Sequence, residues 1–421
     1  MRLTSARPLY CPYCYEDFAE QAIAFRCSGQ LSRQGKRCEP GVDEALRDRI
    51  GFTGALPPVF AADGRQTSAE CPRCGASTTT RVCPACHSQL PVHFGKVPSR
   101  LIALVGAKQS GKSVFMTVLV HELMNDLGQQ LEAAISGADD STRHRFARDY
   151  EKPLYRDSLL LPPTTTAGLR NRVPLVFRFT VPGHGWLGGN GWLGRIGWFG
   201  RNGWRGGADT AQRFEPQHTL MSFFDAAGED LKSQQSVEQH LRYLAAADGI
   251  VLVLDPLQMP GARGLARPGT LLPDPGTTDD EPVKVLETIT DLILAKEGKK
   301  PKHRIAKPLA IVFTKMDALL HNLSLTSPLL QPAPQTPYLE ERDSLAAHHE
   351  IQRLLAQWEG TRIDQFTQLN YRSYRYFGVS ALGETPTADN HVSARGIRPI
   401  RAGDPFIWTL AQLRAIPVKR G

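Results

Sequence analysis

Short apolar runs alternate with amphipathic stretches along most of the chain after residue 99. The first run, Leu101–Val105, is followed by a loop and by a helical pattern over Ser113–Leu127. Apolar runs bounded by turn residues predict buried strands, and apolar positions with a period of about 3.6 residues predict helices. The same patterns predict strands at Val173–Val181, His218–Asp225, Gly249–Asp255, Lys307–Thr314 and Tyr376–Val379, and helices at Val237–Ala247, Val283–Ala295, Ala346–Glu359 and Asp404–Ile416. Such alternation predicts an α/β fold in which helices cover both faces of a mostly parallel sheet.

The first 98 residues lack this alternation and hold every cysteine of the chain. All eight cysteines lie between Cys11 and Cys86, among short polar turns. A chain of 421 residues is also longer than one ordinary compact domain. We therefore predict a cysteine-rich module at 1–98 and an α/β domain at 99–421, with surface loops at Pro256–Pro282 and Asn322–Tyr338.

The loop after the first strand reads GAKQSGKS, which fits the phosphate-binding pattern G-x-x-x-x-G-K-[ST]. Gly106 and Gly111 allow backbone N–H groups, including that of Ser110, to surround phosphates at the positive end of the following helix. Lys112 is predicted to contact the β- and γ-phosphates, and Ser113 to offer its hydroxyl to Mg²⁺. The alternative is a plain glycine-rich turn.

Three later strand ends carry residues suited to the same nucleotide. In DAAG, Asp225 can hold Mg²⁺ through water and the N–H of Gly228 can reach the γ-phosphate. In TKMD, Asp317 can accept hydrogen bonds from guanine N1–H and N2–H₂, a donor pair that adenine lacks. The stem of Lys315 can lie on the base, and backbone N–H at Ser380–Ala381 can meet guanine O6. These motifs predict GTP and GDP as ligands.

The ordered set GAKQSGKS, DAAG, TKMD and SAL resembles the Ras-like, translation-factor-related (TRAFAC) class of GTPases. The resemblance covers about Arg100–Ile416 and implies a mixed sheet with one antiparallel edge pair. With the cysteine clusters, the chain more narrowly resembles double-GTPase-type proteins of bacterial conflict or signalling systems that carry paired zinc ribbons. The class implies a GTP-hydrolysing switch that uses Mg²⁺.

The resemblance also implies roles for residues at three less typical positions. The first switch of the class carries a threonine that binds Mg²⁺ and the γ-phosphate, and LPPTTTAGL offers Thr165 among three adjacent threonines. Glu229 stands where many members have the glutamine that orients the attacking water, so it is either a base or a cause of slow hydrolysis. Thr314 stands where most members have asparagine.

Other functions are compatible with the same residues. Asp255 ends an apolar strand and could be the metal-bearing carboxylate of a nucleic-acid-binding ATPase. TKMD and SAL favour guanine over that alternative. A scaffold that binds GTP without hydrolysing it is a further alternative.

The cysteines form three C-x-x-C pairs and one wider pair, a spacing typical of metal ligands. Two knuckles, Cys71/Cys74 and Cys83/Cys86, are predicted to close one Cys₄ zinc ribbon, whose alternative is paired redox dithiols. The remaining set, Cys11, Cys14, Cys27 and Cys38, is predicted to bind a second zinc. Closed Cys₄ sites are structural, and this module is expected to bind a protein effector or nucleic acid.

Four Gly-Trp pairs recur every six residues at Trp186, Trp192, Trp198 and Trp204. They lie in a glycine-rich insertion at 183–213, between two predicted strands. Either this insertion is disordered or its tryptophans and arginines contact a partner or an anionic membrane surface.

Charge and hydropathy narrow the setting of the protein. The net charge of +8 is modest for this length and permits nucleic-acid or lipid contact without requiring it. No apolar run approaches the length of a membrane-spanning helix, and the N-terminus does not resemble a secretory signal. We therefore expect a cytoplasmic protein, with membrane association through the Gly-Trp repeat as an option.

Overall fold

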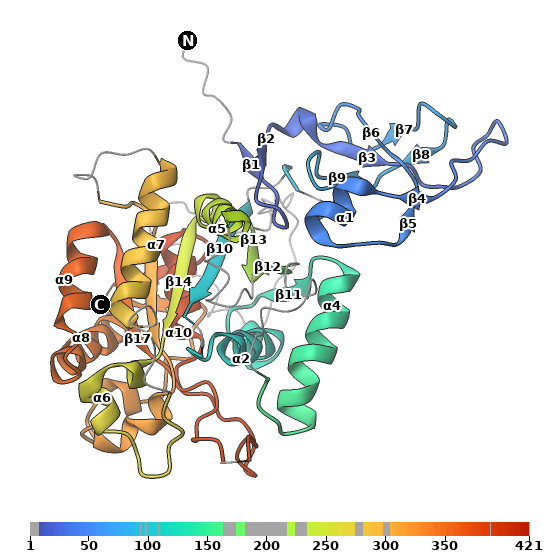
Figure 1. Ribbon diagram of the computed structural model, residues 1–421. Helices are drawn as coiled ribbons and strands as arrows, with labels where there is room; N and C mark the ends of the chain where they lie inside the picture. Colours follow the sequence, from blue (N-terminus) through green and yellow to red (C-terminus); the bar gives the residue numbers. More distant parts are fainter. Residues whose placement is uncertain are drawn as a thin grey trace, which may run out of the picture.

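The structure, a computed structural model, describes residues 8–92, 94–96, 99–107, 109–162, 174–181, 217–223, 234–273, 281–297, 304–387 and 389–420. Within these ranges, a seven-stranded sheet lies between helices (Figure 1). Its strands are β10 Ser99–Gly106, β11 Ala134–Gly137, β12 Leu175–Val181, β13 Gln217–Phe223, β14 Gly249–Leu254, β15 Leu309–Phe313 and β17 Tyr374–Gly378.

The strand order across the sheet is β11-β12-β13-β10-β14-β15-β17. The pairs β13–β10, β10–β14, β14–β15 and β15–β17 are parallel, and β12 runs antiparallel to both of its neighbours. The predicted α/β fold with a mixed, mostly parallel sheet is confirmed.

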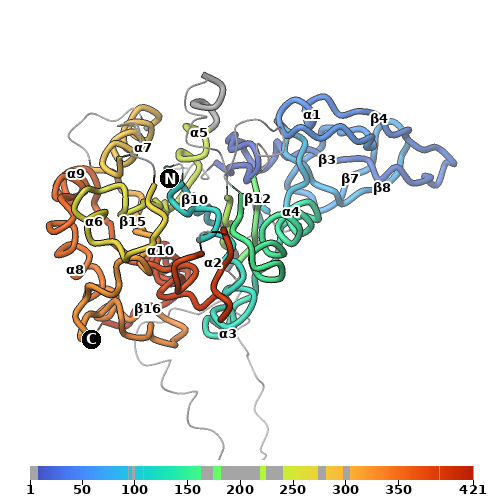
Figure 2. Tube along the Cα trace, turned by 60° about the horizontal axis from the view of Figure 1, so that its bottom comes forward, coloured from blue at the N-terminus to red at the C-terminus, as the bar shows by residue number. Residues whose placement is uncertain are grey.

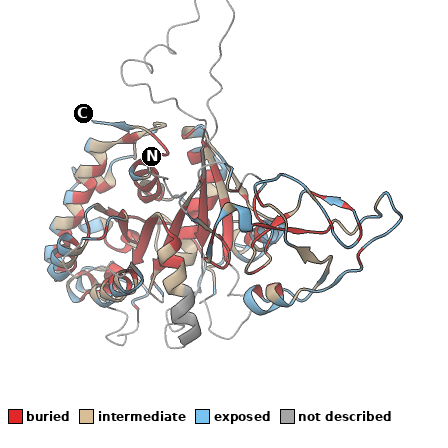
Figure 3. Cartoon of the chain, turned by 90° about the horizontal axis from the view of Figure 1, so that it is seen from above, coloured by how far each residue is buried: buried red, intermediate tan, exposed pale blue. Residues whose placement is uncertain are grey.

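The described helices of the α/β part are α2 Lys112–Met124, α3 Asp126–Gln130, α4 Asp140–Phe146, α5 Gln234–Ala246, α6 Pro260–Gly264, α7 Pro282–Glu297, α8 Glu341–Gln357, α9 Thr361–Asn370 and α10 Asp404–Gln412. In the central strands, alternate residues enter opposite cores, because side chains of a strand point to opposite faces. On β10, Leu101 and Ala103 belong to the core that includes α5, α7, α8 and α9, and Ile102 and Leu104 to the core that includes α2 and α10. Figure 3 shows the buried strands enclosed by helices whose outer faces are exposed. None of the helices that the structure describes is long and apolar enough to cross a membrane.

One edge of the sheet differs from the expectation. The class resemblance implies an antiparallel pair at the edge, whereas β11 lies outside β12 and extends the sheet by one strand. Ala134–Gly137 is short and mostly partly exposed, so no apolar run predicts it. It pairs with Phe177–Thr180 through backbone hydrogen bonds, which need no particular side chain. A ten-residue π-helix, Ala147–Arg156, continues from α4 on this side of the sheet.

The cysteine-rich segment consists of short hairpins and one helix. Its elements are β1 Leu9–Tyr10, β2 Asp17–Phe18, β3 Ala24–Arg26, β4 Gly41–Val42, α1 Glu44–Ile50, β5 Ala55–Leu56, β6 Val59–Phe60, β7 Ala69–Glu70, β8 Ser77–Thr78 and β9 Arg81–Val82. Figures 1 and 2 both show this segment beside strand β12 of the sheet and the nearby helix α4. One apolar core contains residues of both parts, including Cys11 and Leu220. The boundary near residue 98 stays a prediction.

Two predicted surface loops contain ordered turns. In the segment after β14, Pro256–Gln258 is a 3-10 helix and α6 follows at once, with Leu257 and Ala262 buried. The segment 322–338 contains the 3-10 helix Pro328–Leu330, and β16 Leu339–Glu340 follows and pairs with β18 Val418–Lys419.

Candidate nucleotide site and cysteine clusters

The phosphate loop leaves β10 through a position that requires glycine. A Cβ atom at Gly106 would lie 2.5 Å from the carbonyl oxygen of Val253 on β14, so a side chain does not fit there. Gly111 occupies the N-cap position of α2 with φ 77°, and this left-handed backbone conformation favours glycine. The buried Ser110 donates its hydroxyl to the carbonyl oxygen of Ala107 at 2.8 Å. The loop therefore has the tight turn before a helix that the sequence pattern predicts.

The TKMD segment follows β15 and is bonded to the phosphate loop. The Thr314 hydroxyl lies 2.6 Å from the carbonyl oxygen of Ser110 and 3.2 Å from that of Leu254. Thr314 is buried. Thr314 thus joins these two loops through a direct hydrogen bond.

Asp317 and Ser380 come together from the ends of β15 and β17. The Ser380 hydroxyl donates to Oδ1 of Asp317 at 2.7 Å and accepts the backbone N–H of Gly383 at 2.9 Å. Asp317 is 9% exposed. Its second oxygen, Oδ2, has no hydrogen-bond partner within the described ranges. The serine therefore fixes the carboxylate and leaves one oxygen able to accept a hydrogen bond from a ligand.

Asp255 and Lys315 form an ion pair that the sequence did not indicate. Oδ2 of Asp255 lies 2.6 Å from Nζ of Lys315, and Oδ1 accepts the backbone N–H of Leu257 at 2.9 Å. Asp255 is 2% exposed. Both oxygens are thus committed to protein groups, which argues against this carboxylate as a metal ligand. The sequence signal for Asp255 is its place at the end of an apolar strand.

Several predicted site residues lie outside the described residues. These are Thr165, Asp225, Gly228 and Glu229, and the whole Gly-Trp repeat at 183–213. Their roles stay predictions, as does the contact with a membrane or a partner. Of the strand that leads toward Asp225, the structure describes β13 as far as Phe223.

The eight cysteines form two groups of four, but not the predicted groups. One cluster, the first centre, is Cys11, Cys14, Cys83 and Cys86, and the other, the second centre, is Cys27, Cys38, Cys71 and Cys74. The predicted ribbon of two consecutive knuckles at 71–86 is therefore wrong. The reason is that β3 pairs antiparallel with β9. Because the two strands run in opposite directions, Cys83 at the end of β9 lies near the start of β3, close to the first knuckle, Cys11/Cys14. Cys27 at the end of β3 lies near the start of β9, close to the knuckle Cys71/Cys74.

The sulfur geometry of both clusters fits a tetrahedral metal. Four sulfurs at about 2.3 Å from a zinc ion are separated from one another by about 3.8 Å. The Sγ–Sγ distances are 3.7 Å for Cys11–Cys86, 3.8 Å for Cys14–Cys83, 3.6 Å for Cys27–Cys74 and 3.7 Å for Cys38–Cys71. These distances are far longer than a disulfide bond of about 2 Å.

Backbone groups around the sulfurs also suit thiolate ligands. The N–H groups of Tyr13, Gly29 and Ala85 each donate to a cysteine sulfur at 3.4 Å. At Cys71, burial raises the pKa but backbone hydrogen bonds from Cys74 and Arg73 lower it, to about 7, whereas burial raises the pKa of Cys27 and Cys38 in the same cluster. His87 follows Cys86 but contacts the carboxylate of Asp43 at 2.8 Å, so it is a neighbour of the cluster and not a member.

The first knuckle contacts the α/β part directly. The Tyr13 hydroxyl donates to Asp139, at the start of α4, at 2.7 Å. The Tyr15 hydroxyl lies 2.7 Å from Oγ of Ser222 on β13, and its ring lies 4.8 Å from that of Tyr243 on α5. Both tyrosines thus pack against the α/β part.

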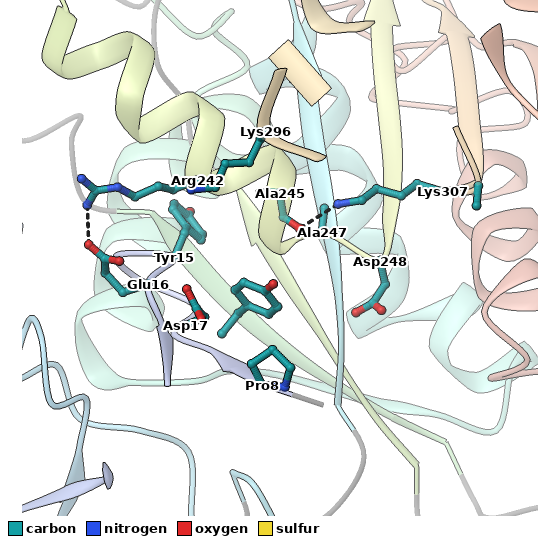
Figure 4. Close-up of a pocket in the computed structure, with 12 residues that line it drawn as sticks. Pro8, Tyr15, Glu16, Asp17, Arg242, Ala245, Ala247, Asp248, Lys296 and Lys307 are labelled. Atoms are coloured by element: carbon teal, nitrogen blue, oxygen red, sulfur yellow. Dashed lines mark hydrogen bonds and ion pairs between the residues drawn. The ribbon is translucent and has the colours of Figure 1, made fainter. Parts of the chain in front are cut away.

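An ion pair and a cavity complete the seam between the two parts. Glu16 faces Arg242 of α5 at 2.7 Å, as Figure 4 shows. Next to this pair is a cavity of about 580 Å³, whose lining includes Tyr10 and Asp17 from the cysteine segment and Lys307 from the loop before β15. The Lys307 amine is held by the carbonyl oxygens of Leu244 and Ala245 at 2.8 and 2.7 Å.

Comparison with known proteins gives one relative in sequence and several likenesses in fold. No model of a known protein family matches the chain. A protein of Mycolicibacterium smegmatis is 28% identical over 378 residues, which cover 85% of this chain and 84% of that protein. Its name is that of a proposed ESX-1 scaffolding and assembly protein, SaeC.

The solved structures that resemble this fold include GTPases. The signal recognition particle receptor complex SRb-GTP/SRX from Chaetomium thermophilum is 11% identical, covers 72% of this chain and 95% of its own, and has a TM-score of 0.27. The Arl6 BBS3 small GTPase from Trypanosoma brucei is 11% identical, with coverage of 76% and 99% and a TM-score of 0.28. The Ski7 GTPase-like domain from S. cerevisiae is 12% identical, with coverage of 75% and 50% and a TM-score of 0.30. At such low identity and TM-score, these likenesses give no residue of this chain a role.

Proposed function

We propose that this chain binds guanine nucleotides at the carboxyl edge of its sheet and hydrolyses GTP as a molecular switch. The observation that carries the proposal is the convergence of three loops, at 106–113, 314–317 and 380–383, from the ends of β10, β15 and β17. Thr314 joins the first two loops and Ser380 joins the last two. In parallel sheets, ligands bind outside the carboxyl ends of the strands.

The base selectivity follows from the chemistry of Asp317. One of its oxygens is held by Ser380 and the other is left as an acceptor with little solvent exposure. A guanine offers two adjacent donors, N1–H and N2–H₂, to such a carboxylate. Adenine offers no matching donor pair, so the carboxylate would lose its hydration without compensation. The ATPase alternative needs Asp255 as a ligand of the metal. Because both oxygens of Asp255 already contact protein groups, guanine is favoured over that alternative.

The phosphate side is assigned from the loop and the sequence motifs. Lys112 begins α2, where the first backbone N–H groups and the helix dipole favour an anion. Ser113 and Asp225 would hold Mg²⁺, which supplies positive charge to the phosphates. We assign the contact with the γ-phosphate to Thr165 and the orientation of the attacking water to Glu229.

We infer that each cysteine cluster holds one structural zinc ion, because all four ligand positions of both clusters are filled by cysteine. With zinc bound, the cysteine segment presents a rigid surface beside the switch domain, to which we assign a protein partner. The name of the mycobacterial relative, a scaffolding and assembly protein, supports a partner of this class. It also favours the second candidate function, a scaffold whose assembly is controlled by GTP without hydrolysis.

Asp317→Asn is expected to transfer preference from guanine to xanthine nucleotides. Xanthine carries a carbonyl where guanine has the N2 amino group, and an asparagine amide can donate to that carbonyl. GDP binding should weaken by roughly 1–3 kcal/mol, on the order of 10- to 100-fold, because a buried polar group loses its partner. Isothermal titration with GDP and XDP measures both changes.

The matched control is Asp291→Asn, at an exposed position on α7, which should leave both affinities unchanged. If Asp317→Asn binds GDP as well as the unmodified chain does, and ATP competes, the guanine assignment is wrong.

Steady-state release of phosphate from GTP separates the switch from the non-hydrolysing scaffold. We expect turnover by the full chain with Mg²⁺, and a large decrease in Glu229→Ala with little change in GDP affinity, because Glu229 is assigned to the water and not to the nucleotide. Stoichiometric GTP binding by the full chain without phosphate release would favour the scaffold.

A further inference from the structure

The ion pair between Asp255 and Lys315 joins two loops that enter the nucleotide site from neighbouring strands. Asp255 follows β14 and Lys315 follows β15, and these strands are parallel neighbours in the sheet. The carboxylate is 2% exposed, whereas the lysine side chain is 33% exposed. The lysine side chain is therefore anchored at a buried carboxylate, while part of it stays exposed to solvent.

The path of the lysine stem is fixed at both ends. At its backbone end, Lys315 adopts φ 54° and ψ 28°, a left-handed conformation that is uncommon for residues other than glycine. At its far end, Nζ lies 2.6 Å from Asp255. Between them, Cε lies 3.9 Å from the position that a Cβ of Gly111 would occupy. The stem thus passes directly over the phosphate loop, next to the place proposed for the nucleotide.

We propose that Asp255 is a positioning residue for purine recognition, which acts by holding the stem of Lys315 as a fixed apolar wall against one face of the base. The inference rests on the proposed guanine site. A lysine side chain without a partner samples many rotamers, and ordering them upon binding lowers affinity. Because Asp255 holds the stem in one conformation before the nucleotide binds, binding does not have to order the side chain and loses no affinity to that entropy change. In this proposal the buried Asp255 carboxylate positions a side chain against the guanine base and does not bind Mg²⁺.

Asp255 also accepts the N–H of Leu257 and so caps the 3-10 helix Pro256–Gln258. This second contact gives an alternative explanation, in which the residue only stabilises the local turn. Asparagine and serine are good caps as well, so Asp255→Asn and Asp255→Ser both keep the capping group and remove the charge. The two explanations then differ in whether the effect of the substitution depends on Lys315.

The test is a double-mutant cycle on the full chain, with GDP as the probe and calorimetry as the readout. Asp255→Asn should weaken GDP binding about tenfold when Lys315 is present. In the background of Lys315→Met, which keeps a long apolar stem without the charge, Asp255→Asn should change GDP affinity by less than about twofold. Asp255→Ser should repeat both results. The ratio of GDP to IDP affinity should stay constant throughout, because Asp317 reads the N2 amino group.

An equal loss in both backgrounds would overturn the proposal and leave Asp255 with its capping role alone. The proposal would also be overturned if the unmodified chain binds GDP and Asp255→Asn binds it with the same affinity. If the unmodified chain binds no guanine nucleotide at all, the proposed function itself fails, and this inference with it.

Discussion

Lys112→Ala is expected to abolish measurable binding of GDP and GTP. The lysine stands at the first position of α2, directly after the turn at Gly111. An ammonium group at about 4 Å from a phosphate contributes roughly 4 kcal/mol at the effective dielectric constant near a protein surface. Its loss corresponds to a decrease in affinity of about a thousandfold. Fluorescence titration with a labelled GDP measures the change.

The control for this substitution is Lys284→Ala on α7, which removes an exposed lysine far along the chain from the phosphate loop. It should bind GDP like the unmodified chain. Both variants should keep their zinc content and melting temperature, since Lys112 belongs to the site and not to either cysteine cluster. If Lys112→Ala binds GTP within about tenfold of the affinity of the unmodified chain, the loop at 106–113 does not hold the phosphates.

Cys14→Ser is expected to destabilise the α/β domain, whereas Cys74→Ser should affect only the outer part of the cysteine segment. The first centre shares one apolar core with the sheet, and the second centre belongs to a small core of its own. Loss of the first metal frees the knuckle that carries Tyr13 and Tyr15. Two hydrogen bonds and an aromatic pair then weaken, which together amounts to roughly 3 kcal/mol.

The two cysteine variants form a matched pair, because each removes one ligand of a four-cysteine cluster. On the proposed assignment, elemental analysis should find one zinc per chain in each variant and two in the unmodified protein. Hydrogen exchange of the peptides that cover β13 and α5 should rise in Cys14→Ser alone, because Tyr15 contacts Ser222 and Tyr243 there. Equal effects of both variants on these peptides would contradict the assignment of the first centre to the sheet domain.

Local patterns along the chain predict the central strands of the sheet and the positions of the motifs that follow them, but not the edge strand β11. The apolar runs at 101–105, 249–255 and 307–314 are strands within one or two residues, because a buried parallel strand needs a continuous apolar run. The phosphate loop, TKMD and the SAL motif follow those strands, and parallel strands carry their carboxyl ends to one edge. Ser110, Thr314, Asp317 and Ser380 therefore meet as the order of motifs predicts.

The grouping of the cysteines and the carboxylate that meets Lys315 depend on strand pairing and cannot be read from local sequence patterns. The spacing of C-x-x-C pairs identifies ligands but not partners, since the partner depends on how the hairpins pair. Because β3 pairs antiparallel with β9, Cys83 and Cys86 join Cys11 and Cys14, and Cys27 and Cys38 join Cys71 and Cys74. In the same way, Asp255 and Lys315 are 60 positions apart along the chain and meet because β14 and β15 are adjacent. Local patterns determine elements and ligand types, whereas contacts between distant side chains depend on strand pairing, which no local pattern encodes.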